Sequence, residues 1–438
     1  MRRWLAPLGL ALLLISASAP ALAAADGGWD ALMNRGAAAV EQSRLAEAEQ
    51  RFREALKLVG EGPAGALRRA TTLNNLGYVL HRMGRLAEAE ELYAQALALR
   101  QEQLGPEHPE VAQSLSNLAE VKRARGLLDE AEKLYRRALA IREKVLGPDH
   151  PDLAQPLSGL AVLYAASGRG EEARELLQRA VRILSAALGD DHPRTLEARS
   201  NLASLEYSLG RFTEAETLYR AVLAGQQATL GEDAPETVAT LVNLAEVLRS
   251  LGKSEEAVAL LEKALELRRT RLGPDHPETA RVLNDLGVNL HALGREEEAR
   301  EKLEQAVAAY EAAEAPLARR LPAYLNLAAV LGSLGRQEEA LRVLEKAASL
   351  SEAGETQANG ELARLWNDLG VVEYALGRYR ESGEKLERAV RVAEAAWGAK
   401  DPRLVPYLRN YATVLSALAR DEEAREVTRR IEELGGGS

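Results

Sequence analysis

Apolar and small residues recur along the chain at helical spacing, in segments that repeat about every 42 residues. The string Asn-Leu-Gly/Ala marks each copy, and its first residue is called the ladder position below. Successive ladder positions lie 41 or 42 residues apart, so ten copies account for nearly all of residues 30–438. A fixed period of about 20–50 residues indicates a solenoid or another repeat array. The ladder positions are Asn34, Asn75, Asn117, Gly159, Asn201, Asn243, Asp285, Asn326, Asp368 and Asn410.

Each copy carries two helical patterns joined by a turn. Glycine suits the turn, because the residue just past a helix C-terminus often takes a left-handed conformation. In the second pattern Ala89, Tyr93 and Ala96 fall on one helix face, and the same small–large–small triplet recurs in later copies. Because one copy cannot bury this face alone, the pattern predicts stacked copies with a continuous core. The turn glycines are Gly84, Gly126, Gly168, Gly210, Gly252, Gly294, Gly335 and Gly377.

The link between copies reads Leu-Gly-x-acid-His-Pro at 104–109, 146–151, 188–193 and 272–277. Its proline is expected to open the next helix, where the missing N–H costs little. Zinc ligands must approach to about 2 Å, whereas equivalent residues of packed helices lie roughly 8–10 Å apart. We therefore predict turn-shaping or capping histidines and no metal site. These histidines are His108, His150, His192 and His276.

The Leu-Gly/Ala pair, the turn glycine and the Ala–aromatic–Ala face resemble tetratricopeptide repeats, and the 42-residue length resembles the repeats of kinesin light chains. The resemblance implies an all-α fold, a right-handed superhelical α-solenoid of about ten helix-turn-helix repeats. It also implies that the first helix of each copy lines a concave groove, and that the ladder asparagine holds the backbone of a bound peptide.

An amide offers both a donor and an acceptor, which suits the N–H and C=O of an extended peptide. The alternative is that these asparagines only pack, by bonding to a neighbouring helix. Residues three and six positions beyond the ladder should face the same groove. A clamp for the C-terminal carboxylate of a peptide would need basic residues just before the ladder positions, and only Arg409 is basic there. We therefore expect an internal segment of the partner to be bound. The candidate peptide-binding residues are Asn75, Asn117, Asn201, Asn243, Asn326, Asn410, Tyr78, Arg123, Tyr207, Arg249 and His291.

Composition narrows the function classes. The net charge is −10, which argues against nucleic acid as a partner, and aromatic residues are only 4 %. Cysteine is absent, which excludes thiolate nucleophiles and Cys-based metal sites. The chain contains no phosphate-binding loop and no nucleophile elbow, so we predict neither an enzyme nor a cofactor. The expected partner is a protein or peptide whose identity the sequence does not give.

The N-terminus has the pattern of a signal peptide. The segment begins with the basic stretch Met1-Arg2-Arg3 and continues with a short apolar run. It ends in Ala21-Leu22-Ala23, the A-x-A pattern that a signal peptidase cuts. The run is too short to span a membrane, and no later apolar run is long enough to span one. We therefore expect residues 1–23 to be removed and the protein to reach a bacterial periplasm or the exterior.

The expected organisation of the remainder is an array at 24–310, an irregular joint at 311–322, a second array with its C-terminal cap at 323–434, and a tail at 435–438. The sequence thus predicts an exported, non-enzymatic scaffold that binds an extended segment in its groove. The alternative is a structural component of a cell-envelope or secretion assembly, engaged through the edges and ends of the array.

Overall fold

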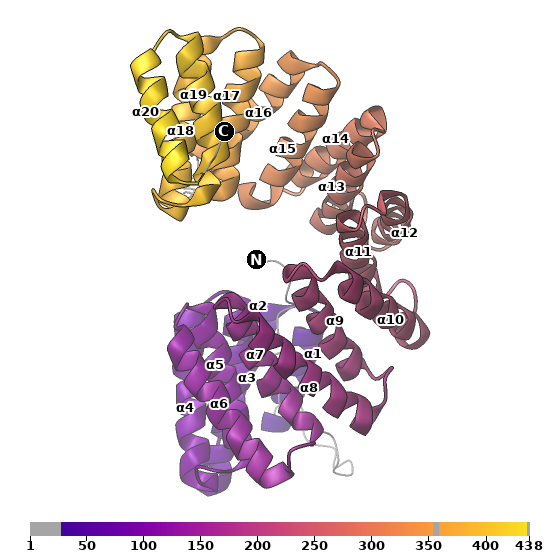
Figure 1. Cartoon of the computed structure of the whole chain (residues 1–438). Helices are drawn as coiled ribbons and strands as arrows, with labels where there is room; N and C mark the ends of the chain where they lie inside the picture. The colour runs from indigo at the N-terminus through magenta and orange to yellow at the C-terminus, as the bar shows by residue number, and fades with distance from the viewer. Residues whose placement is uncertain (1–27, 354–358, 436–438) are drawn as a thin grey trace. The chain divides into compact units, whose positions relative to one another are not determined.

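The computed structural model describes residues 28–353 and 359–435. The predicted signal peptide and most of the predicted tail lie outside these residues. Within the described residues the chain forms twenty α-helices and two short 3₁₀ helices, and no strand (Figure 1). The predicted all-α solenoid of helix pairs is confirmed. The helices fall into ten pairs, in which odd labels mark the first helix of a repeat and even labels the second.

The chain divides into two compact units, which meet in the sequence between Gly231 and Glu232. The helices of unit 1 are α1 (Trp29–Glu41), α2 (Leu45–Lys57), α3 (Gly62–Arg82), α4 (Leu86–Leu104), α5 (Pro109–Ala124), α6 (Leu128–Leu146), η1 (Pro151–Leu153), α7 (Ala154–Ala166), α8 (Gly170–Leu188), α9 (Pro193–Ser208) and α10 (Phe212–Leu230). The helices of unit 2 are α11 (Pro235–Ser250), α12 (Ser254–Leu272), α13 (Pro277–Ala292), α14 (Glu296–Ala312), α15 (Leu317–Ser333), α16 (Gln337–Ala353), α17 (Gly360–Ala375), α18 (Tyr379–Trp397), η2 (Pro402–Leu404), α19 (Val405–Ala417) and α20 (Asp421–Glu433).

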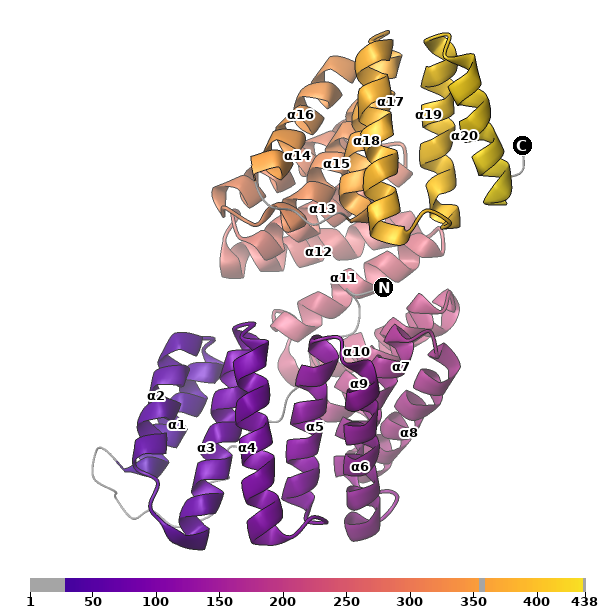
Figure 2. The same cartoon turned by 90° about the vertical axis from the view of Figure 1, so that its left-hand side faces the viewer.

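Within each unit every helix packs against the next one along the chain, as Figure 2 shows for α1 to α6. First helices of successive repeats also contact one another, for example α5 with α7 and α7 with α9. The first helices therefore form a continuous row in each unit. The ladder positions all lie on this row.

The turn between the two helices of a repeat has the left-handed residue that the glycine pattern predicts. Gly84 has φ 79°, and the other predicted turn glycines also have positive φ. In the last repeat Ala419 takes the same conformation at φ 59°, although it carries a Cβ. In the segment 311–322, α14 ends at Ala312 and α15 begins at Leu317. The division of the array at this joint stays a prediction.

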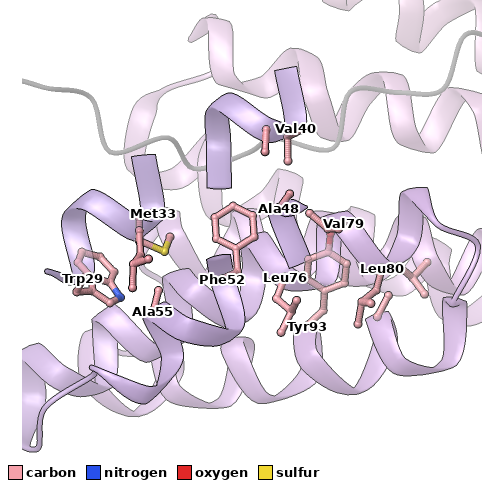
Figure 3. Close-up of a cluster of buried hydrophobic side chains, with 14 of the residues drawn as sticks. Trp29, Met33, Val40, Ala48, Phe52, Ala55, Leu76, Val79, Leu80 and Tyr93 are labelled. Atoms are coloured by element: carbon pink, nitrogen blue, oxygen red, sulfur yellow. The ribbon is translucent and has the colours of Figure 1, made fainter. Parts of the chain in front are cut away.

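The core lies between the helices of each repeat and between adjacent repeats. Ala89, Tyr93 and Ala96 are fully buried on α4, and the equivalent triplets of later repeats are buried as well. Figure 3 shows Trp29, Phe52 and Tyr93 among the aliphatic side chains of one such cluster in unit 1. Each large apolar side chain buried in this way contributes about 1.5–3 kcal/mol. The predicted packing face is confirmed.

The link histidines cap helices. The Nδ1 atom of His108 accepts a hydrogen bond from the backbone N–H of Glu110 at 3.2 Å, and Pro109 is the first residue of α5. This bond satisfies one of the N–H groups that a helix N-terminus leaves without a partner. The same bond is made by the other three link histidines, His150, His192 and His276.

Candidate functional site

The ladder asparagines lie on the row of first helices with their side chains largely inside the protein. Asn75, Asn117 and Asn201 are buried in unit 1. The ladder asparagines of unit 2 are half-buried, and they are Asn243 on α11, Asn326 on α15 and Asn410 on α19. Whether they contact a ligand depends on how much of each amide is already used within the protein.

In unit 1 a chain of hydrogen bonds, the amide relay, links the ladder across two repeats. Arg142 Nη2 on α6 donates to Gln113 Oε1 at 2.5 Å, and Gln113 Nε2 donates to Asn117 Oδ1 at 3.0 Å. Asn117 Nδ2 donates to Asn74 Oδ1 at 2.8 Å, and Asn74 Nδ2 faces Asn75 Oδ1 at 3.4 Å. The amide of Asn117 is therefore engaged on both sides by protein groups.

Unit 2 repeats the inter-helix step of the relay twice. Asn326 Nδ2 donates to Asn284 Oδ1 at 3.0 Å, and Asn284 Nδ2 donates to Asp285 Oδ1 at 3.1 Å. The ladder asparagine thus bonds the residue just before the ladder position of the preceding repeat. The same two bonds, at 2.8 and 3.2 Å, join Asn410, Asn367 and Asp368.

Gly159 interrupts the ladder for a steric reason. A Cβ at this position would lie 2.3 Å from Cε1 of Tyr135. The Tyr135 ring is held there by its hydroxyl, which donates to Glu120 Oε2 at 2.9 Å. An asparagine at position 159 could not fit beside this ring.

Asn201 differs from Asn117 because its amide is not saturated. Its side chain is only 2 % exposed, yet its Oδ1 accepts no hydrogen bond. Asn201 belongs to the lining of a pocket of about 340 Å³ on the first-helix row of unit 1. The pocket is called the α5–α9 pocket below, and its polar lining includes Gln113, Arg142, Asp152, Gln155, Ser158, Arg194, Glu197 and Asn201.

Arg142 is the buried cation of the α5–α9 pocket. Besides Gln113 it donates from Nη1 to the backbone oxygen of Asp152 at 2.5 Å and to Gln155 Oε1 at 3.1 Å. Burial lowers the pKa of Arg142 to about 10, and the nearby Asp152 carboxylate partly opposes this shift. The guanidinium therefore remains charged at neutral pH.

A second, smaller pocket of about 200 Å³ lies on the first-helix row of unit 2. Arg249 and Asn326, both predicted as site residues, belong to its lining. So does Asn289, whose buried Oδ1 accepts no hydrogen bond although its Nδ2 donates to the backbone oxygen of Asp285. The structure thus brings two of the predicted residues together with one that the sequence reasoning missed.

The remaining predicted residues make local contacts. Arg123 forms an ion pair with Glu120, three residues earlier, and His291 Nδ1 lies 2.7 Å from Glu296 Oε2. The first pair lies within α5 and the second joins α13 to α14, and neither by itself indicates a ligand. The two tyrosines contact neighbours on their own repeat: Tyr78 lies under the guanidinium of Arg82, and Tyr207 packs on Phe212.

The part of the chain that the structure describes was compared with the requirements of a metal site and of a membrane span. Residues 28–353 and 359–435 contain no group of three or more His, Asp or Glu side chains placed to hold a metal ion. No helix in these residues is both long and apolar enough to cross a bilayer.

Stacked antiparallel helix pairs with a row of first helices define a helical-repeat protein of the solenoid class. The tetratricopeptide repeat model matches residues 68–144, 110–183, 152–228, 195–270, 236–312 and 361–434, and a second model of the same description matches 323–353. The chain belongs to the tetratricopeptide repeat family. The comparison with curated proteins found no significant match.

Solved structures similar to the chain include kinesin light chain-like repeats. One is the structure of the nearly identical TPR-like repeats of a Podosopora anserina kinesin light chain. Its sequence is 32 % identical to this chain, the match covers 48 % of this chain and 99 % of that one, and the TM-score is 0.44. The quorum sensor NprR from B. thuringiensis, in its apo form, is 17 % identical over 74 % of this chain and 88 % of its own, with a TM-score of 0.56. A STAND protein with a tetratricopeptide repeat sensor from Pyrococcus horikoshii is 14 % identical over 86 % and 55 %, with a TM-score of 0.55.

Proposed function

We propose that this chain is an exported, non-enzymatic scaffold that binds an extended peptide or partner segment along its first-helix row. Tetratricopeptide repeats are protein–protein interaction modules, and this supports the scaffold role. The observation that carries the choice of surface is the α5–α9 pocket, whose lining includes Asn201, a residue with a buried Oδ1 that accepts no hydrogen bond. Native proteins rarely leave such an atom unsatisfied, and a donor on the bound segment would satisfy it.

The structure sharpens the test of groove binding, because it separates two kinds of ladder asparagine. Asn117 is engaged by Gln113 and Asn74, whereas Asn201 has an unused acceptor. We expect the variant Asn201→Ala to lose a bound segment and Asn117→Ala to keep it, although Asn117→Ala should be less stable. The matched pair therefore distinguishes recognition from packing.

The experiment is crosslinking of the mature chain in the native envelope fraction, followed by mass spectrometry of the crosslinked peptides. A synthetic peptide of the crosslinked segment is then titrated calorimetrically into the wild type and both variants. We expect binding to the wild type and to Asn117→Ala, with at least about tenfold weaker binding to Asn201→Ala. Equal binding by all three proteins, with crosslinks at the ends of the array, would favour a structural part of an envelope assembly instead.

The export step rests on the N-terminal pattern, and residues 1–23 lie outside the described residues. N-terminal sequencing of the protein from an extracellular or periplasmic fraction is expected to begin at Ala24. A chain that starts at Met1 in the soluble cell interior would refute export without affecting the groove.

A further inference from the structure

The α5–α9 pocket is large enough to admit a side chain of a bound segment, and most of its lining residues are polar. Its volume of about 340 Å³ lies at the small end of the range of ligand pockets, about 300–1,000 Å³. Three successive first helices contribute to it, together with Arg142 from α6 and Leu184 from α8. A segment that runs along the first-helix row would therefore pass over this pocket and could place one side chain in it.

The charges that line the pocket are balanced. The guanidinium groups of Arg142 and Arg194 belong to the lining, and so do the carboxylates of Asp152 and Glu197. Arg194 Nη2 lies 3.3 Å from Asp152 Oδ1, so these two charges already compensate each other. A carboxylate in the pocket would face two acids, and an ammonium group would face two guanidinium groups. A neutral polar group avoids both repulsions.

The hydrogen-bonding groups of the pocket call for a ligand with both a donor and an acceptor. The buried Oδ1 of Asn201 requires an N–H or O–H donor. Gln155 uses its Oε1 to accept from Arg142, and the same amide carries two N–H donors. A carbonyl oxygen on the ligand can accept from one of them.

Comparison with the repeat that contains Asn117 shows why the oxygen of Asn201 is unsatisfied. Gln113, four residues before Asn117, donates its Nε2 to Asn117 Oδ1 at 3.0 Å. The residue four positions before Asn201 is Glu197, whose carboxylate lacks the N–H donors that the amide of Gln113 has. The substitution of a glutamate for a glutamine at this register thus opens one acceptor to an external donor.

We propose that the α5–α9 pocket is a specificity subsite for the primary carboxamide of a glutamine or asparagine side chain on the bound segment. The proposal rests on the proposed function, because it assumes a segment along the first-helix row. A primary carboxamide carries two N–H donors and one carbonyl acceptor and has no charge. A glutamate has the same shape but lacks the donor, and an aliphatic side chain would leave Asn201 Oδ1 buried without a partner.

The test is selection of random peptides displayed on phage against the immobilised mature chain, followed by calorimetry with the selected synthetic peptide. We expect glutamine or asparagine at one fixed position of the selected peptides. Replacement of that residue by glutamate or methionine should weaken binding by about tenfold or more.

The variant Glu197→Gln tests the mechanism without touching Asn201. It places an amide four residues before Asn201, where it should satisfy Oδ1 as Gln113 satisfies Asn117, so the preference for a carboxamide should disappear. The matched control Glu175→Gln makes the same chemical change on the exposed face of α8 and should retain the wild-type preference. Circular dichroism establishes that each variant is folded.

A second variant, Asn201→Asp, puts a charged acceptor in the pocket and should shift selection toward lysine or arginine at the same position. Selected peptides without a carboxamide preference, or a preference that persists unchanged in Glu197→Gln and Asn201→Asp, would overturn the subsite while leaving segment binding intact. Failure to select any peptide on any protein would overturn the proposed function and the subsite together.

Discussion

Asn117 Nδ2 on α5 donates to Asn74 Oδ1 on α3 across 2.8 Å, and both side chains are fully buried. Removal of one partner leaves the other as an unsatisfied buried polar group. We expect Asn117→Ala to lower the free energy of unfolding by about 1–3 kcal/mol, measured by urea denaturation. A double-mutant cycle with Asn74→Ala should give a coupling energy of at least about 0.5 kcal/mol. Strict additivity of the two changes would contradict the inter-repeat bond.

Gly159 should not tolerate a methyl group, because the Tyr135 ring occupies the space. We expect Gly159→Ala to destabilise the protein by about 1–3 kcal/mol, through overpacking that outweighs the better helix propensity of alanine. The matched control is Gly332→Ala on α15, where nothing lies within 4 Å of the added Cβ. That change should stabilise by about 0.4–1 kcal/mol. If the melting temperatures of both variants shifted in the same direction relative to the wild type, the steric explanation would be refuted.

The repeat that begins at α11 has no side-chain cap, because Ala234 stands where other repeats have a capping histidine. We expect Ala234→Asn to raise the free energy of unfolding by about 0.5–2 kcal/mol. Asparagine is preferable to aspartate here, since Asp233 is adjacent in the sequence. Ala234→Leu, which offers no acceptor, is the control in the same urea titration, and a gain of equal size from leucine would exclude capping as the cause.

The pKa of His81 gives stability a defined pH dependence. Burial on α3 lowers the pKa of His81 below 6.5, with Glu120 opposing the shift and Arg123 adding to it. Between the two pKa values the folded chain binds fewer protons than the unfolded chain, so this contribution to stability rises with pH. The free energy of unfolding of the wild type should therefore increase, relative to His81→Asn, as the pH is raised from 5 to 7.5. A difference that stays constant over this range would show that His81 is not responsible.

The sequence predicts the fold well because the same spacing of apolar and small residues recurs from repeat to repeat. Turn glycines such as Gly84 and the buried faces around Tyr93 follow directly from local spacing. The ladder is also visible, but its hydrogen bonds depend on which residues of neighbouring first helices lie opposite each other. The sequence did carry a signal for these hydrogen bonds. In three repeats an asparagine stands just before the ladder position, and in each case it accepts a hydrogen bond from the ladder asparagine of the next repeat. The pairs are Asn74 with Asn117, Asn284 with Asn326, and Asn367 with Asn410.

Asn201 was predicted as a site residue from its ladder position, but neither Arg142 nor the unsatisfied state of the Asn201 oxygen could be predicted in the same way. A charged residue on a second helix normally indicates a solvated face, yet tertiary packing leaves Arg142 only 5 % exposed. The unsatisfied oxygen of Asn201 becomes evident only when its surroundings are compared with those of Asn117. The site therefore depends on differences between repeats, whereas the fold depends on what the repeats share.

The amide relay of unit 1 has a fixed donor-to-acceptor direction, which runs from Arg142 to Asn74. A guanidinium can only donate, so Arg142 forces Gln113 to present its oxygen, and each following amide, Asn117 and Asn74, is oriented by the one before it. Copies that look interchangeable by their apolar pattern are therefore not interchangeable in order. A duplicated or transplanted repeat would keep the relay only if its neighbour supplied the matching amide, so lengthening the array by copying a module would cost it these hydrogen bonds.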